Sequence, residues 1–176
     1  GSPECLHYRG KSILPSSLKK LKIISNSNEL LKMYHEEEII IPQGLKKLII
    51  LGSTKFGNYI KYLKKIDYLK LNLSRLQDRK GNRVLPEVKE LYLILMIKLL
   101  IHNSRGESLL PSELETLIIK ADNICEKNVK FHNQRGESLF PLNLKKLIIK
   151  KNKVSISKIY NLLYNDQGEY LLPEEC

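Results

Sequence analysis

The chain has 176 residues, of which 42% are hydrophobic, and its 30 basic and 19 acidic residues give a formal net charge of +11. This hydrophobic fraction is sufficient for a buried core, which argues against disorder throughout the chain. The excess of positive charge favours acidic partners, whether protein, nucleic acid or lipid surface, without choosing among them.

The termini and the cysteines set further bounds. Gly1 and Ser2 resemble an expression scar, and residues 3–176 are expected to form a single repeat domain. The longest apolar run, Leu91–Ile101, is interrupted by a lysine and is too short to cross a bilayer, so no membrane partner is expected. The three cysteines are far apart and lack CxxC spacing. This favours an intracellular location, cytoplasmic or nuclear.

One phrase recurs along the chain: a glycine, four residues, a proline, and then Leu-x-x-Leu-x-Ile or a close variant. Its clearest copies begin at Gly10, Gly81, Gly106 and Gly136. A fifth copy keeps Pro42 but has Glu37 in place of the glycine, and a sixth lacks the proline. The first apolar positions of the six units are Leu18, Leu45, Ile66, Val88, Leu114 and Leu144. The array therefore has units of roughly 20–30 residues.

Each unit is expected to contribute one short strand. The predicted strands lie near residues 18–24, 45–51, 66–72, 88–94, 114–120 and 144–150, with a partial repeat at 168–176. The Leu-x-Leu alternation directs one face of each strand inward. A proline can start a strand because it lacks an amide hydrogen, and the glycine before it suits a turn with positive φ. Successive strands should therefore stack in parallel.

The segments between the strands vary in length, and three of them show helical spacing. Helices are predicted over residues 28–38, 58–66 and 155–164, where apolar residues recur three or four positions apart. Asn26, Ser27 and Ser155 are candidate N-caps. Short helices or irregular segments are thus expected on the convex side of the array.

From Gly10 to Pro173, the repeated Leu-Pro-x-x-Leu-x-x-Leu-x-Leu phrase resembles the leucine-rich repeat superfamily, and within it the FNIP-type repeats of social amoebae and giant viruses. The resemblance implies an α/β solenoid: a curved array of about six coils with a parallel concave sheet. Such arrays commonly mediate protein–protein contact. Related proteins often carry an F-box, which implies as one alternative the substrate-recognition part of a ubiquitin-ligase adaptor.

The residues between the inward aliphatic side chains should form the concave face of the sheet. The candidate partner-binding residues are Lys20, Lys22, Lys47, Ile49, Tyr68, Lys70, Tyr92, Ile118, Lys146 and Ile148. Four of them, Ile49, Tyr92, Ile118 and Ile148, are expected to form an exposed apolar strip beside lysines. Such a strip usually marks a binding site. The alternative is that isoleucine and tyrosine simply favour strands.

These patterns predict a non-catalytic scaffold that binds an acidic or mixed protein partner through the concave face. A polyanion or nucleic-acid binder that uses lysine clusters is the alternative. Self-association through open terminal repeats is a further expectation.

No catalytic residue, metal ligand or cofactor site is predicted. His102 and His132 occupy equivalent turn positions, which duplication of the repeat explains. The adjacent Arg105–Glu107 and Arg135–Glu137 pairs read as surface ion pairs. The segment Gly52–Gly57 does not have the residue order of a phosphate-binding loop.

Overall fold

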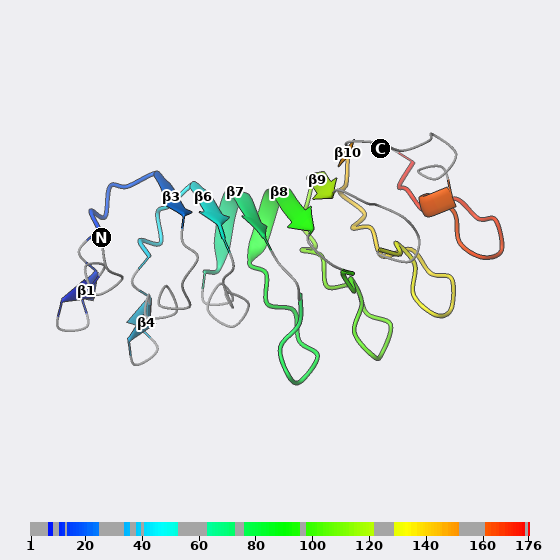
Figure 1. Cartoon of the computed structure of the whole chain (residues 1–176), viewed down its shortest axis with the longest axis horizontal. Helices are drawn as coiled ribbons and strands as arrows, with labels where there is room; N and C mark the ends of the chain where they lie inside the picture. The colour runs from blue at the N-terminus through cyan, green and yellow to red at the C-terminus, as the bar shows by residue number, and fades with distance from the viewer. Residues whose placement is uncertain are drawn as a thin grey trace.

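A six-stranded parallel sheet runs through the molecule (Figure 1). The structure, a computed structural model, describes residues 7–8, 11–12, 14–24, 34–35, 38–39, 41–52, 63–72, 76–95, 98–121, 129–151, 161–174 and 176. The strands of the sheet are β3 (Lys20–Ile24), β6 (Lys47–Leu51), β7 (Lys65–Asn72), β8 (Glu87–Leu95), β9 (Thr116–Ala121) and β10 (Lys146–Lys151). Each of the six segments predicted to be a strand overlaps one of these strands, although β7, β8, β9 and β10 extend one residue beyond the predicted bounds at one end or at both.

The strands follow one another across the sheet in chain order, and every neighbouring pair is parallel. Each connection therefore brings the chain back to the same end of the sheet and adds one coil. The described residues form a parallel β-solenoid of about four turns. Six coils were expected, and much of the chain between β3 and β7 lies outside the described residues.

The register of the sheet places equivalent repeat positions side by side. The middle leucine of each unit pairs with its counterparts in the series Leu21, Leu48, Leu69, Leu91, Leu117 and Leu147. A slip of one residue would turn every inward side chain outward, so burial of the leucines holds this register. The repeat pattern thus determines both the strands and their alignment.

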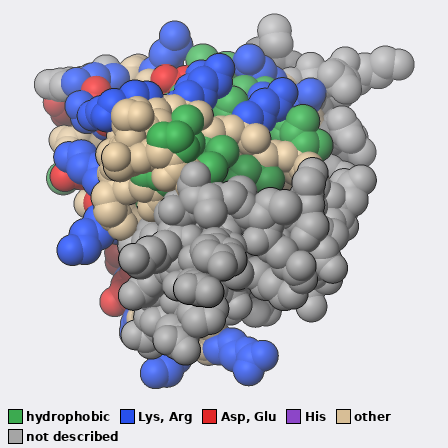
Figure 2. Space-filling view, turned by 90° about the vertical axis from the view of Figure 1, so that its left-hand side faces the viewer, with side chains coloured by type: hydrophobic (Ala, Val, Ile, Leu, Met, Phe, Trp, Pro, Cys, Tyr) green, Lys and Arg blue, Asp and Glu red, His purple; other side chains and the backbone are tan. Residues whose placement is uncertain are grey.

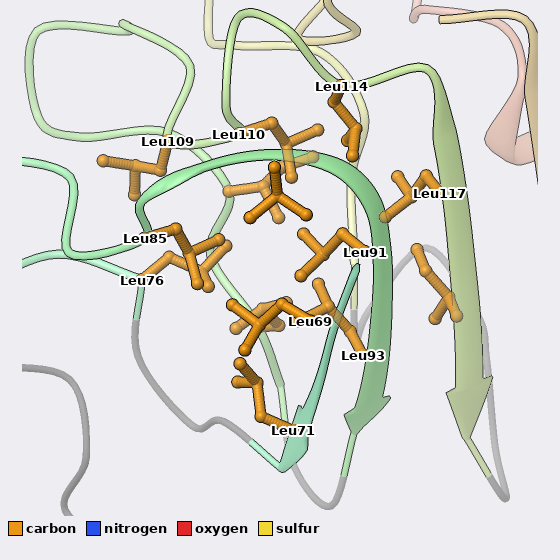
Figure 3. Close-up of a cluster of buried hydrophobic side chains, with 14 of the residues drawn as sticks. Leu69, Leu71, Leu76, Leu85, Leu91, Leu93, Leu109, Leu110, Leu114 and Leu117 are labelled. Carbon is orange, nitrogen blue, oxygen red and sulfur yellow. The ribbon is translucent and has the colours of Figure 1, made fainter. Parts of the chain in front are cut away.

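The core lies directly behind the sheet, between the strands and the return segments. Leu48, Leu69, Leu91 and Leu117 have no exposed surface. Figure 3 shows that leucines of the return segments, such as Leu109, point toward those of the strands. Burial of one such side chain contributes about 1.5–3 kcal/mol. At the two outermost strands the equivalent leucines are only partly buried, because each of these strands has a sheet neighbour on one side only.

Hairpins form the far side of the coils. The four later ones are closed by the bridges Gln77–Arg83, His102–Ser108, His132–Ser138 and Tyr164–Tyr170. Each turns at a glycine with φ near +80°, at Gly81, Gly106, Gly136 and Gly168. This confirms the role predicted for the repeat glycine. In Figure 1 these loops spread further apart than the strands, so the sheet occupies the narrower side of the array.

A buried asparagine in each of the last three hairpins links successive coils. Asn133 Oδ1 accepts hydrogen bonds from the amides of Arg135 and Glu137 at 2.9 and 3.0 Å, which shapes its own hairpin. Its Nδ2 donates to the carbonyl of Gly106, in the preceding hairpin, at 3.0 Å. A Cβ at Gly106 would lie 3.1 Å from that nitrogen, and its φ of +81° is one that other residues rarely adopt, so glycine favours the link.

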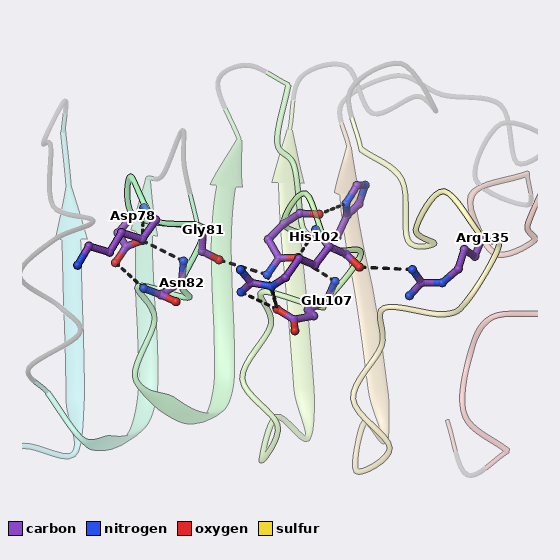
Figure 4. A network of polar contacts seen from close by, with 9 residues as sticks. Asp78, Gly81, Asn82, His102, Glu107 and Arg135 are labelled. Carbon is purple, nitrogen blue, oxygen red and sulfur yellow. Dashed lines mark hydrogen bonds and ion pairs between the residues drawn. The ribbon is translucent and has the colours of Figure 1, made fainter.

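The link is repeated by Asn103 with the carbonyl of Gly81 at 3.3 Å and by Asn165 with that of Gly136 at 2.9 Å. Figure 4 shows part of this network, including Asp78, which stands at the equivalent position of the first of the four hairpins. The hairpins are therefore stacked by one recurring polar contact.

The helix predicted over residues 28–38 is wrong where the structure describes that segment. Within 28–38, the pairs Tyr34–His35 (β4) and Glu38–Ile39 (β5) form an antiparallel hairpin. Likewise, β1 (His7–Tyr8) pairs antiparallel with β2 (Lys11–Ser12). These hairpins lie on the side of the coils opposite the sheet. In segments this short, the spacing of the apolar residues fits a hairpin as well as a helix.

The other two helix predictions overlap regions that are only partly described. Residues 63–64 are irregular, and β7 begins at Lys65. Of residues 161–164, the described part of the third segment, Asn161 and Leu162 are helical. Asn26, Ser27 and Ser155, proposed as N-caps, lie outside the described residues. No helix among the described residues is long and apolar enough to cross a membrane.

Glu87, at the start of β8, connects its own coil to the next. Its carboxylate accepts hydrogen bonds from Arg83, from the hydroxyl of Ser112 at 3.2 Å and from the amide of Glu113 at 3.1 Å. Burial alone would raise the pKa of Glu87, but these three donors outweigh it and lower the pKa below its ordinary value. The ionised form therefore stabilises the folded chain.

We expect Glu87→Gln to lower the free energy of unfolding by about 1–2 kcal/mol at neutral pH, because a charged acceptor is lost. Since the folded pKa is depressed, the contribution of Glu87 is present above its unfolded value and is lost as pH falls through the folded pKa. Urea denaturation of both proteins from pH 7 to pH 3 should show the difference shrinking. A constant difference, or an equal loss in the exposed control Glu174→Gln, would contradict this role.

Candidate functional site

The face of the sheet directed away from the core, here called the outer face, is the candidate site. Its residues occupy three rows across the strands. They are Lys20, Lys47, Tyr68, Glu90, Thr116 and Lys146; Lys22, Ile49, Lys70, Tyr92, Ile118 and Ile148; and Ile24, Leu51, Asn72, Ile94, Lys120 and Lys150. All ten residues predicted to bind a partner lie on this face.

The outer face is strongly basic. Its three rows contain seven lysines and a single acidic residue, Glu90. Figure 2 shows lysine and arginine side chains gathered along the top of the molecule, where the sheet lies, with apolar side chains between and below them. None of the ion pairs found within the described residues involves a lysine of these rows. The face can therefore attract a negatively charged partner.

Tyrosine rings hold several of these lysines in place. The Nζ of Lys47 lies 4.1 Å from the ring centroid of Tyr68 on the next strand. The Nζ of Lys70 lies 4.2 Å from the centroid of Tyr92, again one strand further on. Lys150, on β10, reaches back to the same Tyr92 ring at 5.3 Å. Each ring attracts the ammonium groups through its negative face.

The predicted apolar strip is less exposed than expected. Tyr92 retains 8% and Ile118 7% of their surface, although neither belongs to the core cluster behind the sheet. Lys150 must cross β9, the strand that carries Ile118, to reach Tyr92 on β8. Lys70 and Lys150 thus cover the ring of Tyr92, as amphipathic side chains do. Ile49 and Ile148 are partly exposed.

Ion pairs line the edge where the strands begin. Lys46 Nζ lies 3.5 Å from Asp67, and Lys145 Nζ lies 3.3 Å from Glu115. These pairs are exposed to solvent and contribute little to stability. On the outer face itself, burial and the charge of Glu90 raise the pKa of Tyr68 above its ordinary value.

Sequence reasoning left Lys120 and Lys150 out of the candidate site. Both lie in the third row, and the repeat register itself places them beside each other. That register was the available signal. The contact of Lys150 with Tyr92 spans two strands, so strand pairing alone does not indicate it.

Each hairpin histidine contacts the backbone of its own hairpin. His102 Nδ1 lies 2.8 Å from the carbonyl oxygen of Asn103, and His132 Nδ1 lies 2.9 Å from that of Asn133. His132 Nε2 is 3.8 Å from Asp166, and together they line a small cavity of about 150 Å³. No cluster of three metal-ligating side chains occurs within the described ranges.

Two other predictions from the sequence concern the hairpins and the glycine loop. The ion pairs predicted at the hairpin tips are present, between Arg105 and Glu107 at 2.9 Å and between Arg135 and Glu137 at 2.5 Å. Of the segment 52–57, only Gly52 is described, and the remainder lies outside the described residues.

Two larger cavities occur among the described residues, and the lining of the second includes Lys146 of the outer face. One of about 560 Å³ is lined mainly by Leu99, Leu100, Ile101 and Val129. The other, of about 390 Å³, lies beside β10 and includes Leu147, Ile149, Leu163, Leu172 and Cys176. Burial raises the pKa of the Cys176 thiol. Neither cavity gathers the nucleophile, base and orienting group that a catalytic site requires.

Self-association at the terminal coils stays a prediction.

The described chain is thus a parallel β-solenoid with a six-stranded sheet and a basic outer face. Comparison with protein-family models, with curated proteins and with solved structures finds no match. The class of protein therefore rests on its own repeat and geometry.

Proposed function

We propose that this protein is a non-catalytic scaffold that binds an acidic or mixed protein partner through the outer face of its sheet. One observation carries the proposal: seven lysines and one glutamate surround a row of isoleucine and tyrosine side chains on a single parallel sheet. Positive charge steers and orients an acidic partner. The partly exposed Ile49 and Ile148 offer apolar contact at either side.

A protein partner is favoured over nucleic acid because lysine side chains already approach the tyrosine rings of the outer face. Single-stranded nucleic acids bind by stacking bases on open aromatic faces. The rings of Tyr68 and Tyr92 are already approached by lysine ammonium groups, and Tyr92 is buried. No arginine, the side chain best suited to bidentate phosphate recognition, occurs in the three rows.

We further infer that the solenoid is of the leucine-rich-repeat type and closest to FNIP repeats. The Leu-x-x-Leu-x-Leu strand phrase, the proline before it and the placement of the sheet on the narrower side of the array support this assignment. A role in substrate recognition by a ubiquitin ligase is an alternative that follows from this resemblance alone.

Selection of peptides from a random dodecapeptide display library tests the proposal. Peptides selected on the wild-type chain should be rich in aspartate and glutamate with interspersed apolar residues. The double variant Lys22→Glu/Lys47→Glu should bind them at least about tenfold more weakly, since two contacts change from attraction to repulsion. The matched control Lys98→Glu/Lys130→Glu makes the same change in net charge on exposed return segments outside the sheet.

Equal losses in the two double variants would mean that net charge, and not the outer face, determines binding. The polyanion alternative is tested with a single-stranded thymidine oligonucleotide. If the oligonucleotide binds more tightly than the selected peptides, and its affinity falls steeply and linearly with salt on a log–log plot, the protein-binding proposal is wrong.

A further inference from the structure

Two positively charged groups converge on one tyrosine at the centre of the outer face. Lys70 approaches the ring of Tyr92 from β7, and Lys150 approaches it from β10, with Nζ–centroid distances of 4.2 and 5.3 Å. Because both distances end at the same centroid, the ammonium groups lie within about 10 Å of each other, the Debye length near 0.1 M salt. Their charges therefore act on the same small volume above the sheet.

The ring organises this pair before any partner binds. Two ammonium groups at this separation repel each other, and on flexible stems they would move apart. Attraction to the face of Tyr92 opposes that movement. The phenol is itself fixed, since it is 8% exposed and lies between paired strands. An anion bound within reach of both lysines would relieve their repulsion without further ordering of their side chains, which favours binding.

We propose that Lys70, Tyr92 and Lys150 form a receptor for a side-chain carboxylate of an acidic peptide. The proposal rests on the proposed function and names the contact within the outer face that an acidic partner uses. Lysine provides a compact point charge that pairs with a single carboxylate as readily as with phosphate. The covered ring leaves no face for a nucleobase, so a peptide fits the receptor better than a nucleic acid does.

Fluorescence anisotropy with a labelled decaglutamate peptide tests the receptor. Lys70→Gln and Lys150→Gln should each weaken binding by about threefold or more, because each removes one ammonium–carboxylate contact. Tyr92→Leu should weaken binding to a similar extent although it removes no charge, because the lysines lose the ring that holds them. Tyr92→Phe keeps the ring and should bind like the wild type. Lys98→Gln, outside the sheet, is the charge-matched control.

The outcomes separate the receptor from the wider function. If Tyr92→Leu unfolds at the wild-type temperature and binds decaglutamate as the wild type does, the receptor is wrong. The receptor also fails, while the proposed function stands, if Lys22→Glu/Lys47→Glu abolishes binding but both single glutamine variants leave it unchanged. Absence of binding, or binding insensitive to every outer-face substitution, overturns both. Tighter binding of a thymidine oligonucleotide through the same three residues overturns the peptide assignment.

Discussion

Replacement of Asn133 by alanine is expected to lower the free energy of unfolding by about 3 kcal/mol. The side chain is 2% exposed and makes hydrogen bonds to its own hairpin and to the preceding coil. Without it, the partly buried amides of Arg135 and Glu137 and the buried carbonyl of Gly106 lose their partners. Urea denaturation followed by far-UV circular dichroism measures the loss. Asn161→Ala, at an exposed position, is the control and should change stability by less than about 0.5 kcal/mol.

The first of the four hairpins supplies a sharper version of this experiment. Asp78 replaces the asparagine there and accepts hydrogen bonds from the amides of Lys80 and Asn82 at 2.8 and 2.9 Å, while its second oxygen accepts from Asn82 Nδ2 at 3.2 Å. Asn133 instead donates to the carboxylate of Glu137 at 3.2 Å.

Asn133→Asp alone would therefore place two carboxylates in contact, and Glu137→Asn in the same chain should recover part of the stability. The bond to the preceding coil stays lost in the double variant, so recovery should be incomplete. Full recovery would mean that the contact between coils contributes nothing. If the double variant is no more stable than Asn133→Asp, the contact of residue 133 with Glu137 in its own hairpin does not account for the loss of stability.

Leu91→Ala is expected to cost about 2–5 kcal/mol, the range for a fully buried leucine whose cavity cannot collapse. Leu91 has no exposed surface and lies on β8, between β7 and β9. Leu21→Ala, on the outermost strand β3, removes the same atoms at a partly buried position and should cost less than half as much. The exposed Leu142→Ala should be nearly neutral, because this side chain is 91% exposed.

Thermal and urea unfolding of these three variants measures the order of the effects. A cost for Leu21→Ala equal to that for Leu91→Ala would mean that β3 is covered by another part of the protein. Equal costs for Leu142→Ala and Leu91→Ala would contradict the position assigned to the core.

The six strands and their register follow from the repeated phrase. Alternation of aliphatic and polar residues is a local signal, and equivalent residues such as Leu69 and Leu91 can align only if successive units stack in parallel. The positive φ of Gly106 and Gly136 follows in the same way, because the turn recurs with its glycine. The membership of the outer face is a direct consequence of the alternation.

The polar contact between the hairpins was not predicted, although the sequence carries the asparagine that makes it. The phrases around His102 and His132 drew attention to the histidines, yet the asparagine that follows each of them is the more buried residue. Its spacing of three residues before the glycine and four before a glutamate was visible in the sequence. The partner of each asparagine is the glycine carbonyl of the preceding hairpin. No pattern within one unit of the sequence identifies that partner.

By itself, the sequence determined the parallel ladder, the inward leucines and the basic character of the outer face, because each depends on residues within one unit and on their exact repetition. The tertiary structure decided that hairpins and not helices close the described coils, that Asn133 bonds to the preceding coil, and that Lys150 helps to cover Tyr92. These features depend on side chains one or two units apart in the chain, and their positions are known only once the coils are stacked.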